Sequence, residues 1–83
     1  MNAVSRPVQL QVNTNGAWKT VLQFDAGNAA AAELVEQGTQ MLFEASGKVS
    51  FRVATCDRHP AVLRQLSAST YGLWMNATLG AGQ

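Results

Sequence analysis

The chain of 83 residues holds one cysteine, two prolines and no long apolar run. One cysteine cannot form an internal disulfide, and a secreted chain of this size would usually carry several. No apolar stretch approaches the ~20 residues that span a bilayer, and residues 1–12 lack the charged start and apolar stretch of a signal peptide. We therefore expect a cytoplasmic protein that is neither exported nor embedded in a membrane.

Histidine is equally scarce, because His59 is the only one and lies three residues after Cys56, with Asp57 between them. These are the residue types of a cysteine nucleophile with its base, but catalytic triads usually draw on separate elements around a rigid cleft. As zinc ligands, Cys56 and His59 would supply two of the four that a structural site needs. We favour a simple turn over both readings.

Other signatures of catalysis are also missing from the sequence. No glycine-rich phosphate loop is followed by a helix, and no pair of carboxylates lies at the ends of separate predicted strands. We expect a protein that is not an enzyme, with no catalytic residue, no bound metal and no cofactor.

Charge is sparse and unevenly distributed along the chain, whose net charge is +1. Residues 1–47 carry two basic and four acidic side chains, whereas residues 48–83 carry four basic and one acidic. This asymmetry either marks two oppositely charged surfaces for partners or simply keeps the protein soluble, and with so few charges we favour solubility.

A β-hairpin is predicted at the start of the chain. Residues 7–12 and 17–24 alternate between apolar and polar side chains, and Asn15-Gly16 between them is a strong signal for a tight turn. In the second segment we expect the following side chains to share one buried face: Trp18, Thr20, Leu22 and Phe24.

One long helix is predicted to begin after an N-cap at Asp25 or Asn28, to end at Ala45, and to be followed by Gly47 as the terminating residue. Gly38 within it suggests a close approach of the helix to the sheet. We expect one apolar stripe to face the sheet: Ala31, Leu34, Val35, Gly38, Met41, Leu42 and Ala45.

Further strands follow the helix. Residues 48–55 alternate, residues 61–67 and 73–75 are apolar enough for a fourth and a short fifth strand, and turns are expected at 56–60 and 68–72. The predicted class is α+β, with an antiparallel sheet of four or five strands in the order β-β-α-β-β-(β) and one helix on one face. We expect a single domain over residues 1–76 and a flexible tail over 77–83.

One helix can cover only one face of that sheet, so apolar side chains of the later strands are expected on the other face. In a chain this short, such a face suggests a homodimer or binding to a larger protein partner, unless the ends of the chain fold over it or its apolar residues are exposed singly. We expect a small non-enzymatic interaction module. Phe43 is expected on the side of the helix away from the sheet, where it could contact a partner or pack under a flexible terminus of the chain. The candidate interaction residues are Phe43, Leu63, Trp74 and Met75.

Binding of single-stranded nucleic acid is the alternative function. Arginine and aromatic side chains on a sheet are typical of surfaces that neutralise phosphates and stack bases. The signal is weak, because the isoelectric point near 8.0 is below that of most basic binding domains. The residues of this alternative are Arg52, Arg58, Arg64, Tyr71 and Trp74.

Overall fold

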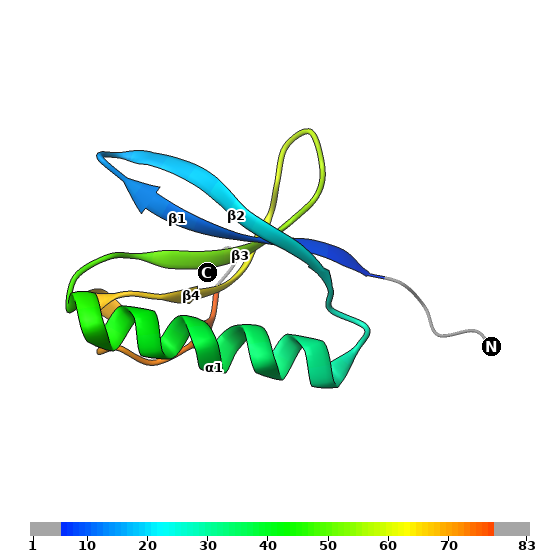
Figure 1. Ribbon diagram of the computed structural model, residues 1–83. Coiled ribbons are helices and arrows are strands. Elements are labelled where there is room, and N and C mark those ends of the chain that lie inside the picture. The colour runs from blue at the N-terminus through cyan, green and yellow to red at the C-terminus, as the bar shows by residue number, and fades with distance from the viewer. Residues whose placement is uncertain (1–5, 78–83) are drawn as a thin grey trace.

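A computed structural model describes residues 6–77 as five antiparallel strands and one α-helix, in the order β-β-α-β-β-β (Figure 1). The strands pair in the spatial order β2-β1-β3-β4-β5, so β2 and β5 form the two edges. This arrangement confirms the predicted α+β class with one helix on an antiparallel sheet. The elements are β1 (Pro7–Thr14), β2 (Ala17–Asp25), α1 (Ala29–Ser46), β3 (Phe51–Thr55), β4 (Val62–Leu66), a 3₁₀ turn η1 (Ala68–Thr70) and β5 (Met75–Asn76).

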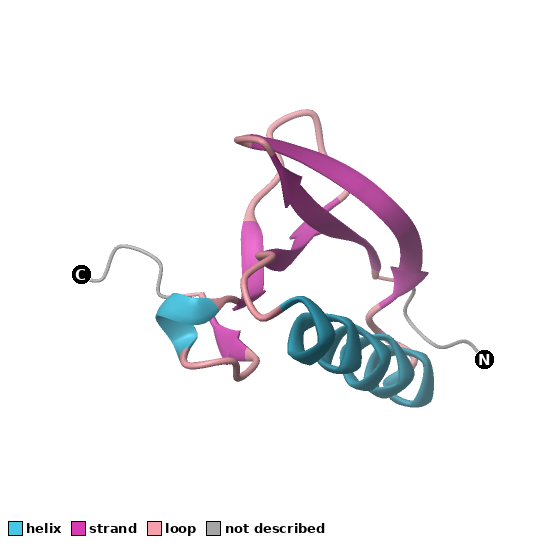
Figure 2. Ribbon diagram, turned by 60° about the vertical axis from the view of Figure 1, so that its left-hand side comes forward, coloured by secondary structure: helices cyan, strands magenta, loops and turns pink. Residues whose placement is uncertain are grey.

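The β1–β2 hairpin forms at the predicted turn. Asn15 and Gly16 both have positive φ, 54° and 86°, which is the backbone of a tight turn that matches the twist of the flanking strands. The hairpin then curls away from α1, and its turn lies at the far end of the sheet from the helix (Figure 2).

A β-bulge in β2 makes the predicted hairpin face wrong. Leu10 pairs with Leu22 but Gln11 pairs with Thr20, which leaves Val21 without a partner in β1. Because paired residues share a face, the extra residue places Trp18 and Thr20 on the side of the sheet away from α1, whereas Leu22 and Phe24 remain on the side of α1. Trp18 and Thr20 therefore do not share the face of Leu22.

The ends of α1 are set by local hydrogen bonds. Of the two predicted N-caps, Asn28 is the one used, and its Oδ1 accepts a hydrogen bond from the backbone N–H of Ala31 at 3.1 Å. At the other end Gly47 adopts the left-handed conformation, with φ of 76°, and its N–H donates to the carbonyl of Phe43 at 2.7 Å.

The helix is rolled about its axis relative to the prediction. Thr39 and Phe43 are its buried residues, and Val35 is partly buried against the core. These three positions are four residues apart and define the face that meets the sheet. The predicted stripe is displaced from this face, because Leu34, Met41 and Leu42 are exposed. The side chains of Leu34, Met41 and Leu42 instead lie on the surface.

Two further expectations about α1 are wrong for the same reason. Phe43 does not point away from the sheet but is 8% exposed and packs in the core. Gly38 is not held against the sheet, since a Cβ added to it would find no atom within 4 Å. The close approach of a glycine occurs at Gly72 instead, where an added Cβ would lie 3.0 Å from the ring of Phe43.

The core is small and lies between the sheet and the buried face of α1. Its six buried apolar residues come from β1, α1, β3 and β4, and Leu66 is fully buried among them. They are Val8, Leu10, Phe43, Phe51, Val53 and Leu66. β2 contributes only partly buried side chains, so one edge of the sheet lies at the margin of the core.

The face of the sheet away from α1, the open face, is mainly polar. Gln9 and Gln11 are buried there and hydrogen-bonded, since Gln9 Nε2 donates to the carbonyl of Thr55 at 3.0 Å and Gln11 Oε1 accepts from Arg52 Nε at 2.7 Å. Thr20 also donates to Gln9 Oε1. The predicted uncovered apolar face is therefore largely a face of amides and hydroxyls.

The predicted tail over 77–83 lies outside the described residues except for Ala77, whose N–H donates to the carbonyl of Leu63 at 2.9 Å. Within residues 6–77, no helix combines the length and the apolar character that crossing a membrane requires.

Candidate functional site

The segment that contains Cys56 and His59 forms a loop between β3 and β4. Its neck is closed by Thr55, whose N–H donates to the carbonyl of Ala61 at 3.0 Å and whose Oγ1 accepts from the N–H of Ala61 at 2.9 Å. Cys56 is half-buried and His59 is exposed. Among residues 6–77, no three side chains of Cys, His, Asp and Glu gather to form a metal-binding group.

The five residues of the nucleic-acid alternative do not share one surface. Arg52 pairs with Gln65, and Arg64 pairs with Val53, so the two arginines lie on opposite faces of the sheet. Tyr71 is highly exposed in the turn after η1, and Arg58 is exposed in the loop between β3 and β4.

On the open face, Arg52 is engaged by its neighbours. Its guanidinium lies 4.2 Å from the centre of the Trp18 ring, and its Nε donates to Gln11. Partial burial lowers the pKa of Arg52 from its ordinary value. The aromatic partner of Arg52 is therefore Trp18, a residue that the alternation of β2 predicts on the buried face.

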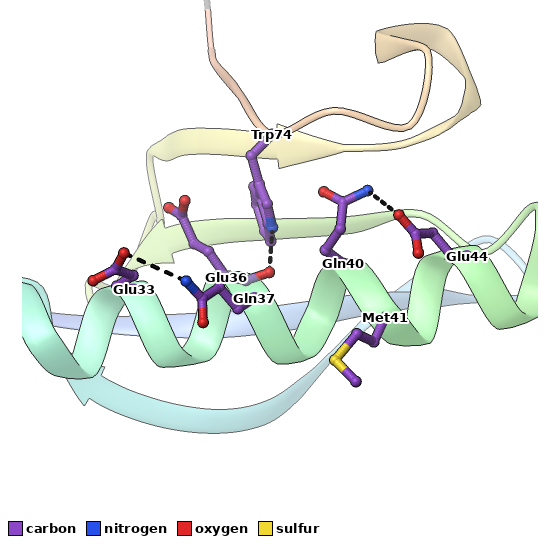
Figure 3. A pocket seen from close by; sticks show the side chains of 7 residues that line it. All are labelled: Glu33, Glu36, Gln37, Gln40, Met41, Glu44 and Trp74. Carbon is purple, nitrogen blue, oxygen red and sulfur yellow. Dashed lines mark hydrogen bonds between the residues drawn. The ribbon is translucent and has the colours of Figure 1, made fainter.

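On the other face, Arg64 and Trp74 hold α1 to the sheet. Arg64 Nη2 donates to Glu36 Oε1 at 3.0 Å, and Arg64 Nε lies 2.6 Å from Glu36 Oε2. The indole N–H of Trp74 donates to the backbone carbonyl of Glu36 at 2.9 Å (Figure 3). Gln40 adds a third link, because its side-chain N–H donates to the carbonyl of Gly72. Trp74 and Arg64 are thus structural parts of the interface between helix and sheet.

The candidate interaction residues are also dispersed. Phe43 is buried, Trp74 packs between sheet and helix, and only Leu63 and Met75 are exposed, at 38% and 48%. Leu63 lies at a second bulge, where Val53 pairs with Arg64 but Ala54 pairs with Val62. Met75 pairs with Gln65 and so lies on the open face. These four side chains do not form one docking surface.

A larger apolar surface lies away from all of these candidate residues. A groove of about 480 Å³ runs between α1 and the edge strand β2, and we call it the α1–β2 groove. Its lining is almost entirely apolar and comprises Leu10, Val21, Leu22, Leu34, Val35, Gly38, Thr39 and Leu42. Four of these side chains are large, apolar and exposed, at 48% for Val21, 42% for Leu22, 70% for Leu34 and 58% for Leu42.

The bulge in β2 helps to build this groove. In a regular strand Val21 and Leu22 would point to opposite faces, but here both line the α1–β2 groove. The roll of α1 provides the other wall of the groove, because it turns Leu34 and Leu42 toward β2 instead of into the core. One signal for this roll was present in the sequence: Phe43 is the largest apolar side chain in α1, and burying it sets which other residues are left outside.

The opposite flank of α1 is acidic. A second groove, of about 430 Å³, is lined by Glu33, Glu36, Gln37, Gln40, Met41, Glu44 and Trp74. Figure 3 shows Trp74 reaching down to the helix between Glu36 and Gln40, with Glu33 and Glu44 further along the helix on either side. Glu33 and Glu44 accept long hydrogen bonds of 3.4 Å from Gln37 and Gln40. Met41, which is 69% exposed, lies on the ridge of α1 between the two grooves.

Comparison of the chain with protein-family models, with curated proteins and with solved structures finds no match. The function must therefore be argued from the side chains themselves.

Proposed function

We propose that this protein is a small, non-enzymatic interaction module that binds another protein chain through the α1–β2 groove. The observation that carries the proposal is the gathering of Val21, Leu22, Leu34 and Leu42 around one hollow at the edge of the sheet. Single exposed apolar residues are ordinary on protein surfaces, but a contiguous apolar patch on a small protein commonly marks a binding site.

The energetic argument is that these side chains remain in water unless a partner covers them. Burial of one leucine side chain stabilises a complex by roughly 1.5–3 kcal/mol before the costs of association. Leu34 and Leu42 are both more than half exposed in the isolated chain, so most of this free energy is still to be gained. Neither of them contributes to the buried core.

The geometry favours this proposal over single-stranded nucleic-acid binding. Arg64 is paired with Glu36, and Arg52 is stacked on Trp18 and lies on the other face of the sheet. A bound strand would need to compete with these contacts and could not reach both arginines on one face.

The first experiment measures the mass of the protein in solution by size exclusion with light scattering over a range of concentrations. It compares the native chain with the double variant Leu34→Gln and Leu42→Gln. Leu73→Gln is the matched control, because Leu73 is 59% exposed but is not among the residues that line the groove. Self-association that the double variant removes and the control retains would support the proposal.

A partner other than the chain itself is detected by photo-crosslinking in the native cell. A photoreactive phenylalanine analogue replaces Leu42 in the groove or, as the control, the exposed Gln65 on the open face. We expect a discrete protein adduct from position 42 that is absent from position 65. The proposal is wrong if the chain is monomeric and the two positions give the same adducts. Tightly held nucleic acid that Arg52→Ala releases would support the alternative instead.

A further inference from the structure

The charges on α1, which lie across the ridge of the helix from the α1–β2 groove, indicate what kind of chain fits the groove. α1 carries three glutamates and no lysine or arginine. Glu36 is neutralised by Arg64, which forms the one ion pair among residues 6–77. Glu33 and Glu44 form no ion pair in this range, and their carboxylates accept hydrogen bonds from glutamine side chains. A chain lying on the ridge of α1 would meet apolar side chains on one flank and unneutralised carboxylates on the other.

Gly38 marks the place where such a chain can come close. It lies near the middle of α1 and lines the groove, and no atom of the protein lies within 4 Å of the Cβ that it lacks. A glycine inside a helix destabilises the helix relative to alanine, and nothing within the described part of the chain requires it here. The absence of a side chain between Leu34 and Leu42 deepens the groove at its centre.

The edge strand does not favour the addition of another β-strand. Strand addition needs a regular row of free backbone groups, and the bulge at Val21 interrupts that row in the middle of β2. In its lining, the α1–β2 groove instead resembles the apolar grooves that accept one face of an amphipathic helix.

Resting on the proposed function, we infer that the α1–β2 groove binds a basic amphipathic helix of a partner protein. The apolar side of this helix packs between Leu34 and Leu42 over Gly38, and lysine or arginine side chains on its flank reach across the ridge of α1 to Glu33 and Glu44. A second copy of this chain fits less well, because its own α1 has no basic side chain to offer. Electrostatic complementarity of this kind mainly sets partner choice and the rate of encounter.

The test uses three labelled peptides, each about as long as α1, and measures their binding to the full chain by fluorescence anisotropy. One places leucines at helical spacing with lysines on the flanks. The second has glutamates in place of the lysines. The third has the composition of the first in an order without helical spacing. We expect the lysine peptide to bind roughly tenfold or more tightly than either of the others and to weaken as salt is raised.

Two sets of variants assign this binding to the groove. Glu33→Gln with Glu44→Gln should weaken the lysine peptide by about threefold to tenfold and reduce its salt dependence. Asp57→Asn is the matched control, because it removes an exposed carboxylate in the loop between β3 and β4. Gly38→Leu should weaken binding by roughly tenfold while leaving the fold intact, since the space around this position is empty.

The outcomes distinguish this inference from the proposed function. Equal binding of the lysine and glutamate peptides, no binding of either, or unchanged binding to Gly38→Leu would overturn the basic-helix inference. Self-association that depends on Leu34 and Leu42 would also overturn it, because a second copy would then occupy the groove, but the proposed function would stand. The proposed function would be wrong as well only if the native chain is monomeric and crosslinking is the same from positions 42 and 65.

Discussion

The two flanks of α1 are held in different ways. Toward β4 and β5, the helix is attached by directional bonds, from Arg64 to the carboxylate of Glu36 and from Trp74 to its carbonyl. Toward β2, α1 and the strand face each other across an apolar groove that their own side chains leave partly empty. We call these the fastened flank and the groove flank.

The difference explains how a small core leaves an apolar surface exposed. Burial of Val35, Thr39 and Phe43 sets the face of α1 that meets the sheet, and a second constraint on the rotation of the helix acts at its flank. The bonds on the fastened flank supply that constraint, because they hold one side of the helix at a defined distance from β4. Leu34 and Leu42 are thereby kept outside on the groove flank without the need for contacts of their own.

The largest effect on stability is expected from Phe43, because its burial positions both flanks of α1. Phe43→Ala should destabilise the protein by about 3–5 kcal/mol, because it empties a core position and removes the contact with Gly72. Thermal or urea unfolding followed by circular dichroism measures this loss. Leu42→Ala on the adjoining exposed position is the control and should cost far less. Equal losses for the two variants would contradict the observed roll of α1.

Gly38→Ala should stabilise the protein by about 1 kcal/mol, since alanine is the better helix former and the added Cβ meets no atom. This change tests the groove flank alone, because it adds one methyl group there and leaves the bonds of the fastened flank intact. The measurement is again the free energy of unfolding. A loss of stability would show that Gly38 is needed by the fold and is not free for a partner.

The fastened flank is tested by Glu36→Gln, which leaves the Arg64 guanidinium without its carboxylate. Both side chains are partly exposed, so solvent screening limits the expected destabilisation to about 1 kcal/mol. Glu33→Gln is the matched control on the same helix and should change stability by less than about 0.5 kcal/mol. The difference between the two should shrink at high salt. If the two variants lose the same stability, the ion pair does not fasten the helix.

The smallest effect is expected where β2 leads into α1. Asp25 Oδ1 accepts hydrogen bonds from the backbone N–H groups of Arg6, at 2.7 Å, and Gly27, at 2.8 Å, and these bonds lower the pKa of Asp25 below its ordinary value of 3.8. A depressed pKa in the folded state means that the stabilisation is present above the unfolded pKa and is lost as the pH falls through the folded pKa.

Asp25→Asn should therefore be slightly less stable than the native chain at neutral pH, and the two should converge in acid. Thermal unfolding at a series of pH values measures this convergence. A stability difference that persists unchanged into acid would show that the charge of Asp25 does not stabilise the connection between β2 and α1.

Much of the fold could be predicted because it depends on neighbours in sequence. Alternation of side chains indicated β1 and β3, Asn15-Gly16 indicated the turn, and Asn28 and Gly47 indicated the ends of α1. These signals act through local backbone conformations and hydrogen bonds within a few residues. The α+β class followed from their order.

The candidate sites could not be predicted in the same way. Trp18 and Arg64 lie on faces opposite to their expected partners because bulges at Val21 and Leu63 shift the strand register. A bulge depends on how two strands fit together, and no local pattern in either strand announces it. The residues of the expected sites therefore lie on different surfaces, and none of them lines the α1–β2 groove.

The order of the strands and the helix, the first turn and the caps of α1 follow from the sequence, because these features depend on contacts within a few residues. The tertiary structure decides which sides of β2 and α1 are buried. The roll of α1 follows from seating Phe43 in the core and from the bond between Arg64 and Glu36, which join residues distant in the chain. Leu34 and Leu42 are proposed as a binding surface because they are exposed, so the proposed function rests on the tertiary structure.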